Sequence, residues 1–247
     1  MNQRDALALK ERERRFREHD QPYGAHAAAT RSRWSNFIEM HSVVSGLRLA
    51  GNSRLIDIGG ADGRLLDRVR ACNATCTLIG TDFAVNPLRG LMEKPLNAAG
   101  VCADMCALPM RDGSVSHAAA VQVLQQIPGR ALREQALRSV HAALAPRGRF
   151  VALVLNQVTW RTAVPNGKEG RLNANLHVYL YDQHDLREEL TAAGFSVRSI
   201  VGVNNLPGRI ADRLGLLGAW IDMAITAWIR PLSIRKGRYL RAVCTKN

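Results

Sequence analysis

The chain has 247 residues, of which 47% are hydrophobic and 22% are charged, and this composition excludes a wholly disordered or collagen-like protein. Lys and Arg number 34 against 21 Asp and Glu, and a net charge of +13 can draw a protein to nucleic acid or to an anionic membrane. The 5 cysteines are too sparse for a disulfide scaffold, and residues 1–19 lack the apolar segment of a secretory signal. We therefore expect a cytoplasmic enzyme or binding protein.

The N-terminal part of the chain is predicted to be helical. Residues 1–19 are expected to form a charged, exposed helix, in which Glu13 and Arg17 make one of two favourable i,i+4 pairs. Residues 26–49 contain a second helical stretch. We expect residues 1–49 to form a helical cap on one larger domain that spans residues 50–247.

From residue 50 onward, short apolar runs alternate with helical segments. This alternation predicts βαβ units and a parallel sheet. Residues 156–181 between them are polar and irregular. The predicted strands are 54–58, 76–81, 101–103, 115–124, 149–155, 195–203 and a last, antiparallel strand at 238–245; the predicted helices are 63–71, 86–94, 130–144 and 182–193.

An apolar helical insertion is predicted at residues 204–237, between the last two strands. Charged residues interrupt its apolar stretch at 208–232, so a helix that spans a membrane is not expected. Packing on the domain or on a second copy of the chain is the first interpretation. A lid over an apolar substrate and a peripheral membrane contact are the alternatives. On a single helix one continuous face would hold Leu214, Leu217, Ile221, Ile225 and Trp228.

Three features at the ends of predicted strands point to a ligand site. The sequence DIGGADG at 57–63 follows the first strand, and glycines there let a ligand approach the backbone closely. Asp82 ends the second strand, where an acid can accept both hydroxyls of a ribose. Asp104 follows the third strand. Ligands of such sheets bind outside the carboxyl ends of the strands, so these residues are expected to meet there.

The chain resembles the class I S-adenosylmethionine-dependent methyltransferases, in particular the branch with quinone-biosynthesis and small-molecule enzymes. The resemblance covers residues 50–203 and the final strand. It rests on the segments LIDIGGADG, IGTDF, ADMCALP, HAALAPRGRFVAL and DLREELTAAGF, in that order. It implies a Rossmann-like α/β fold with a seven-stranded, mostly parallel sheet, an antiparallel last strand and helices on both faces. The family motif D-x-G-x-G-x-G is matched by Asp57, Gly59 and Gly63, whereas Ala61 replaces the middle glycine.

The resemblance also implies roles for individual residues toward the cofactor S-adenosylmethionine. Asp57 would lie near the cofactor's amino group, and the glycine turn would face its amino-acid portion. Asp82 would hold the ribose, and Asp104 would accept from the adenine amine. The full set of expected cofactor contacts is Asp57, Gly59, Gly60, Ala61, Gly63, Asp82, Phe83, Asp104, Met105 and Gln122.

Catalytic and substrate residues are harder to predict, because the cofactor supplies the reactivity and the protein aligns the acceptor. His177 is the candidate base, and a packing role is its alternative. Tyr23, Trp34, Asn156 and Tyr179 are the expected substrate contacts. No metal site is expected, because the pairs Cys72/Cys76 and Cys102/Cys106 are interpreted as small buried side chains.

The sequence thus predicts a methyltransferase that acts on oxygen, nitrogen or carbon of a small, apolar metabolite. A secondary metabolite, a quinone or a lipid-linked intermediate would fit. An RNA methyltransferase and a non-catalytic cofactor-binding protein are the alternatives, and nucleic acid is the less expected partner because no separate RNA-binding module is visible.

Overall fold

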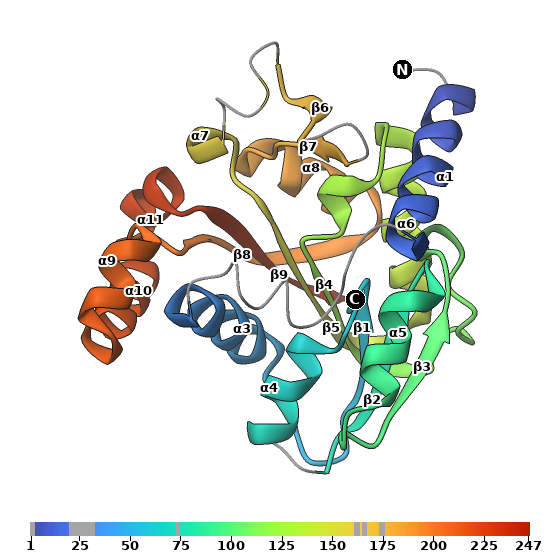
Figure 1. Cartoon of the computed structure of the whole chain (residues 1–247), viewed down its shortest axis with the longest axis horizontal. Helices are drawn as coiled ribbons and strands as arrows, with labels where there is room; N and C mark the ends of the chain where they lie inside the picture. Colours follow the sequence, from blue (N-terminus) through green and yellow to red (C-terminus); the bar gives the residue numbers. More distant parts are fainter. Residues whose placement is uncertain (1–2, 20–32, 73–74, 161–163, 165–166, 173–175) are drawn as a thin grey trace.

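A seven-stranded sheet forms the centre of the computed structural model, which describes residues 3–19, 33–72, 75–160, 164, 167–172 and 176–247 (Figure 1). The strand order is β3-β2-β1-β4-β5-β9-β8; β9 pairs antiparallel with both β5 and β8, and the other pairs of neighbours in this sheet are parallel. The predicted mostly parallel sheet with an antiparallel last strand is confirmed. Its strands are β1 (Arg54–Ile58), β2 (Thr77–Asp82), β3 (Ala98–Cys102), β4 (Val115–Val121), β5 (Leu144–Leu155), β8 (Phe195–Val203) and β9 (Tyr239–Lys246).

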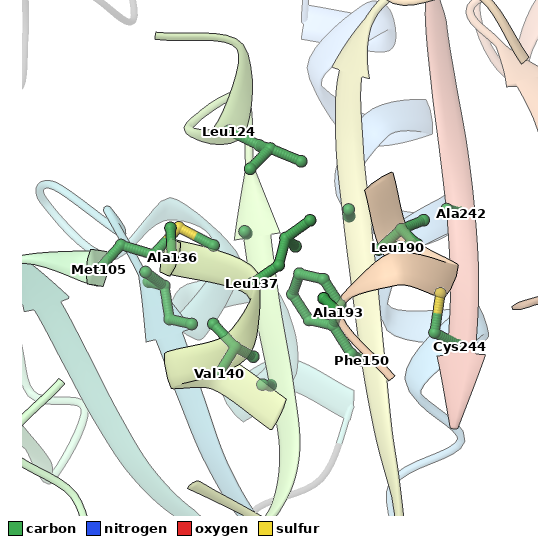
Figure 2. Close-up of a cluster of buried hydrophobic side chains, with 14 of the residues drawn as sticks. Met105, Leu124, Ala136, Leu137, Val140, Phe150, Leu190, Ala193, Ala242 and Cys244 are labelled. Atoms are coloured by element: carbon green, nitrogen blue, oxygen red, sulfur yellow. The ribbon is translucent and has the colours of Figure 1, made fainter. Parts of the chain in front are cut away.

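Helices cover both faces of this sheet, as expected. Alternate residues of the central strands point to opposite faces, so Phe150 and Val151 of β5 enter different apolar clusters although both are fully buried. One cluster contains side chains of α3 (Arg33–Leu47), α4 (Arg64–Cys72) and α5 (Val85–Met92). The other contains side chains of α6 (Arg130–Ala143) and α8 (Gln183–Ala192), and Figure 2 shows Leu137 of α6 and Leu190 of α8 beside Phe150.

The N-terminal helix α1 (Gln3–His19) is less exposed than the sequence suggests. Ala6 and Glu13 are buried, and Arg17 donates to Glu13 at 2.7 Å in a pair that is itself largely buried. Glu18 accepts the backbone N–H groups of Val85 and Asn86 at the start of α5. These contacts fix α1 over the carboxyl ends of β2 and β3, where the ligand site was predicted (Figure 1).

Residues 156–181 contain short elements that the sequence did not indicate. They are α7 (Gln157–Trp160) and a two-stranded antiparallel ribbon of β6 (Glu169–Arg171) and β7 (His177–Tyr179). The ribbon continues into α8, whose Asp182 accepts the Asp185 N–H at 2.8 Å as the predicted N-cap.

Three helices, rather than the single predicted one, lie between β8 and β9. They are α9 (Gly208–Leu214), α10 (Leu216–Trp228) and α11 (Arg230–Lys236), called the inserted helices below. Gly215 breaks the segment with a φ of 56°, and Pro231 lies in the first turn of the third helix, where its ring is tolerated. Among the described residues no helix has the length and apolar character needed to cross a bilayer.

Candidate cofactor and acceptor site

The glycine turn after β1 leaves no room for larger side chains. A Cβ at Gly59 would lie 2.3 Å from Val123 Cγ2, and a Cβ at Gly60 would lie 2.6 Å from the Asp57 carboxylate. Gly59 and Gly63 also have positive φ angles of 65° and 80°. Close packing and backbone conformation together therefore require glycine in this turn.

Ala61 keeps the left-handed conformation that a glycine would adopt more easily. Its φ is 47°, whereas Gly60 is not among the residues with positive φ. Ala61 itself, and not the neighbouring Gly60, therefore adopts the left-handed conformation. The local backbone strain costs about 1–2 kcal/mol. The turn is preserved despite the departure from the motif.

Asp57 is buried beneath this turn without a hydrogen-bond partner for either carboxylate oxygen among the described residues. Burial raises its pKa to about 7, although the positive charge of Arg64 opposes the shift. A buried carboxylate that lacks a partner favours a cationic or hydrogen-bond-donating ligand.

Asp82 and Phe83 follow at the end of β2. Asp82 is buried and accepts the Ala84 N–H at 3.1 Å, and burial raises its pKa. The Phe83 ring lines a small cavity and has the Arg17 guanidinium 5.8 Å from its centroid. Both predicted residues thus lie beside the glycine turn.

Asp104 follows β3, two residues after its end at Cys102, and forms an ion pair with a residue that the sequence pattern did not single out. Lys10 of α1 donates to both carboxylate oxygens of Asp104, at 2.6 and 2.5 Å. The two residues of this ion pair help to line the small cavity, which has a volume of about 50 Å³ and is also lined by Gly59, Phe83 and Met105. Helix α1 therefore covers the space in which the resemblance to the methyltransferase family places the adenine.

Gln122 directly follows β4, which lies beside β1 on the side away from β2, and it has a φ of 61°. Its Nε2 donates to one carboxylate oxygen of Glu39 at 2.9 Å, and Asn204 Nδ2, directly after β8, donates to the other at 2.9 Å. Asn204 also has a positive φ, of 58°. Glu39, buried in α3, thus joins the ends of two strands that are not neighbours in the sheet.

Asn204 also lines a second, larger cavity, of about 680 Å³, at the inserted helices. Its wall is apolar at Trp160, Ile225 and Leu232, and it carries two cations, Lys236 and Arg238, but no acidic residue among the described residues that line it. The Arg238 guanidinium lies 4.7 Å from the centroid of the Trp160 ring.

His177 and Tyr179 lie in the β6–β7 ribbon, and β7 packs on the segment Leu124–Gln126, whose Gln126 lines the small cavity. His177 Nε2 is buried 3.2 Å from Glu169 Oε1, and this pairing lowers the pKa of Glu169 to about 2. The Tyr179 hydroxyl donates to Asp185 at 2.9 Å, and burial raises its pKa to about 12. Neither is among the described residues that line the cavities, so their predicted roles gain no support from this placement.

The other predicted substrate contacts have mixed positions. Asn156 is buried, and its Nδ2 donates to the carbonyls of Ile234 and Gly237, so it ties β5 to α11. Trp34 packs beside Gly215 of the inserted helices. Tyr23 lies outside the described residues. Of the four cysteines in the two pairs, Cys76 and Cys106 are buried, whereas Cys72 and Cys102 are exposed, contrary to the expectation.

Several residues of the site had no distinguishing pattern in the sequence. Lys10 is one cation among many in a charged helix, and Glu39 is the acidic residue of a mixed helix, RWSNFIEMHSVVSGL, in which its burial in the structure is what distinguishes it. Trp160 offered the one available signal, because it closely follows the carboxyl end of β5.

Comparisons with known proteins agree with this geometry. The model of the methyltransferase domain family matches residues 17–200. No curated protein sequence matches the chain. The solved structure of the 1,6-didemethyltoxoflavin-N1-methyltransferase of Burkholderia thailandensis, with 1,6-didemethyltoxoflavin and S-adenosylhomocysteine bound, superposes with a TM-score of 0.67 at 16% identity over 100% of this chain and 91% of that one.

Two further solved structures share the fold. The [4+2]-cyclase SpnF gives a TM-score of 0.60 at 22% identity over 84% of this chain and 79% of its own. The geranyl diphosphate C-methyltransferase of Streptomyces coelicolor gives 0.59 at 12% identity over 85% and 75%. Since the family model covers well over half of the chain, this protein belongs to the methyltransferase domain family and is a class I S-adenosylmethionine-dependent methyltransferase.

Proposed function

We propose that the enzyme transfers the methyl group of S-adenosylmethionine to oxygen, nitrogen or carbon of a small, apolar metabolite that binds in the 680 Å³ cavity. The observation that carries the proposal is the Gln122–Glu39–Asn204 connection, which joins the cofactor turn to this cavity. A secondary metabolite, a quinone or a lipid-linked intermediate fits the volume and the lining.

The residues around the glycine turn fit the cofactor. A bare backbone at Gly59 and Gly60 allows close approach, and the buried carboxylate of Asp57 offers a partner for an ammonium group. When bound, S-adenosylmethionine supplies an electrophilic methyl group on a sulfonium. Asp82 would hold the ribose and Asp104 the adenine, with Phe83 and Met105 beside them.

The larger cavity fits an acceptor that is mainly apolar and carries an anionic or hydrogen-bond-accepting group. Trp160, Ile225 and Leu232 would exclude water from the acceptor's body. Lys236 and Arg238 would orient its polar end. The geranyl diphosphate C-methyltransferase named above is titled for an acceptor of this general kind.

Within the reaction, this chain's own residues act by alignment. Glu39 holds the side-chain amides of Gln122 and Asn204 from both sides, which fixes the edges of the cofactor turn and the acceptor cavity relative to each other. An in-line displacement is sensitive to such alignment, because small errors in the approach of the acceptor raise the barrier steeply.

A labelling experiment tests the proposal. Purified enzyme, methyl-labelled S-adenosylmethionine and an extract of cells are incubated, and the extract is divided into organic-soluble small molecules, RNA and protein. We expect label in the organic-soluble fraction, and a Trp160→Ala variant with unchanged S-adenosylhomocysteine affinity should label it more slowly at low extract concentration.

Two outcomes would contradict the proposal. Label mainly in RNA would favour the RNA methyltransferase suggested by the net charge of +13. Cofactor binding without transfer to any fraction would favour a non-catalytic protein of the same fold.

A further inference from the structure

The inserted helices expose their large apolar side chains instead of burying them. Trp220 is 67% exposed and Trp228 is 87% exposed. We call the exposed apolar residues of α9 and α10, together with Ile229 between α10 and α11, the apolar ridge; they are Ile210, Leu214, Leu216, Leu217, Trp220, Ile221, Trp228 and Ile229. A ridge of this size is beyond what scattered surface residues of a soluble domain account for.

The inner side of α10 explains this orientation. It buries Gly218, Ala219 and Asp222, and Asp222 accepts the backbone N–H groups of Asn205 and Leu206 at 2.6 and 2.9 Å. Small residues and a hydrogen-bonded carboxylate therefore attach the helix to the domain. The large side chains face away from the domain because the anchoring contacts occupy the other side.

Cations surround the apolar ridge. Arg209, Arg213 and Arg235 are exposed, and within the described chain no carboxylate forms an ion pair with them. Between residues 204 and 238 the sequence has only two acidic residues, and one of them, Asp222, is buried. The surface thus combines exposed tryptophan and leucine with excess positive charge.

We propose that the inserted helices dock on an anionic lipid bilayer, with the apolar ridge in the interfacial region and the surrounding arginines on the lipid phosphates. Amphipathic helices with aromatic and leucine side chains on one side and Arg or Lys beside them bind bilayers in this way. Tryptophan favours the interface, because its ring is apolar and its N–H is polar.

Charge decides between a bilayer and a second copy of the chain. In a twofold interface the same patch faces itself, so the cations around the ridge would be brought together with only Asp212 as an exposed acid to offset them. An anionic bilayer instead neutralises every cation. The proposal concerns binding alone and does not depend on which acceptor is methylated.

Vesicle flotation tests the proposal with the full-length protein. Vesicles of phosphatidylcholine mixed with phosphatidylglycerol should carry the protein upward, vesicles of phosphatidylcholine alone should carry much less, and added salt should release it. Trp220→Ser with Trp228→Ser should weaken binding at least about tenfold, because burial of two indole rings is lost. The double variant Val85→Ser with Met92→Ser, which removes exposed apolar side chains of α5, is the matched control and should bind normally.

A charge variant keeps the test decisive if the tryptophan variant does not fold, as judged by S-adenosylhomocysteine binding. Arg209→Gln, Arg213→Gln and Arg235→Gln together should reduce binding to the anionic vesicles at least about tenfold. The proposal is overturned if the wild-type protein does not float with anionic vesicles, or if it binds both kinds of vesicle equally. A different result would identify a second copy of the chain as the partner. In that case the wild-type protein is a dimer that does not bind vesicles, and the tryptophan variant is a monomer.

Discussion

At the scale of single residues, Asp57 shows how the site is prepared for a cation. Its carboxylate is buried beneath the cofactor turn without a protein partner among the described residues, and burial raises its pKa to about 7. In an unfolded chain the pKa of an aspartate is about 4. Between about pH 4 and about pH 7 the folded protein therefore holds a proton on Asp57 that the unfolded chain has lost. Folding stability should consequently fall as the pH rises from about 4 to about 7.

Asp57→Asn tests this account. The neutral amide removes the cost of a buried charge, so at pH 8 the ligand-free variant should have a free energy of unfolding higher by about 1 kcal/mol or more, measured by urea denaturation. Its affinity for S-adenosylhomocysteine should fall about tenfold or more, because a bond to a charged group is lost. An unfolding free energy that is lower in the variant at pH 8 would contradict the assignment.

The Lys10–Asp104 ion pair leads to a second prediction at this scale. Asp104 is the residue expected to accept from the adenine amine, and Lys10 already donates to both of its oxygens. Lys10→Ala should therefore strengthen S-adenosylhomocysteine binding about threefold to fivefold, whereas Asp104→Ala should weaken it, as measured by calorimetry. Lys94→Ala, which breaks a Lys–Asp pair at Asp67 away from the site, is the control. Weaker binding in Lys10→Ala would show that Lys10 assists the cofactor.

At the scale of elements, the sequence predicted those strands whose formation depends on residues close together in the chain. The run RLIDI at 54–58 and the run at 195–203 became strands of those bounds, because apolar stretches bounded by turns have few alternatives. The same reasoning failed for residues 208–232. The periodic pattern of leucine and tryptophan does not reveal that Gly215 breaks the helix, nor that Asp222 supplies the inward contact.

Asp222 should therefore be more important for stability than the large apolar residues around it. Asp222→Ala would leave the N–H groups of Asn205 and Leu206 without their acceptor, and we expect a loss of about 2–3 kcal/mol. For a chain of this size, the melting temperature should fall by about 4–10 °C in calorimetry. The exposed Asp112→Ala should have little effect. A loss of stability from Asp112→Ala that matched that of Asp222→Ala would contradict the anchoring role.

At the scale of the whole molecule, the two cavities belong to different halves of the sheet. The cofactor turn lies at the ends of β1, β2 and β3, whereas the larger cavity lies beside β5, β8 and the inserted helices. The sequence could predict the first half, because glycines and strand-end acids carry a local pattern. The second half is assembled from segments far apart in the chain, namely Ser35, Trp160, Asn204 and Arg238, and no local pattern links them.

This division predicts separable effects on the two ligands. Asp82→Ala should weaken S-adenosylhomocysteine binding about tenfold or more, through the loss of a charged hydrogen bond. Leu232→Ala, in the wall of the larger cavity, should leave that affinity within about twofold and raise the acceptor KM in the labelling assay. Unchanged cofactor affinity in Asp82→Ala would remove this residue from the cofactor site.

The Glu39 carboxylate has a thermodynamic consequence, because its two oxygens hold Gln122 on the cofactor side and Asn204 on the acceptor side. Gln122 and Asn204 both have left-handed backbone conformations. Because both bind the Glu39 carboxylate, a shift of either strand end is transmitted to the other through that carboxylate. The affinities for the two ligands are then linked. Reciprocity requires that the factor by which cofactor tightens acceptor binding equals the factor by which acceptor tightens cofactor binding, and replacing Glu39 with glutamine should bring both factors toward one together.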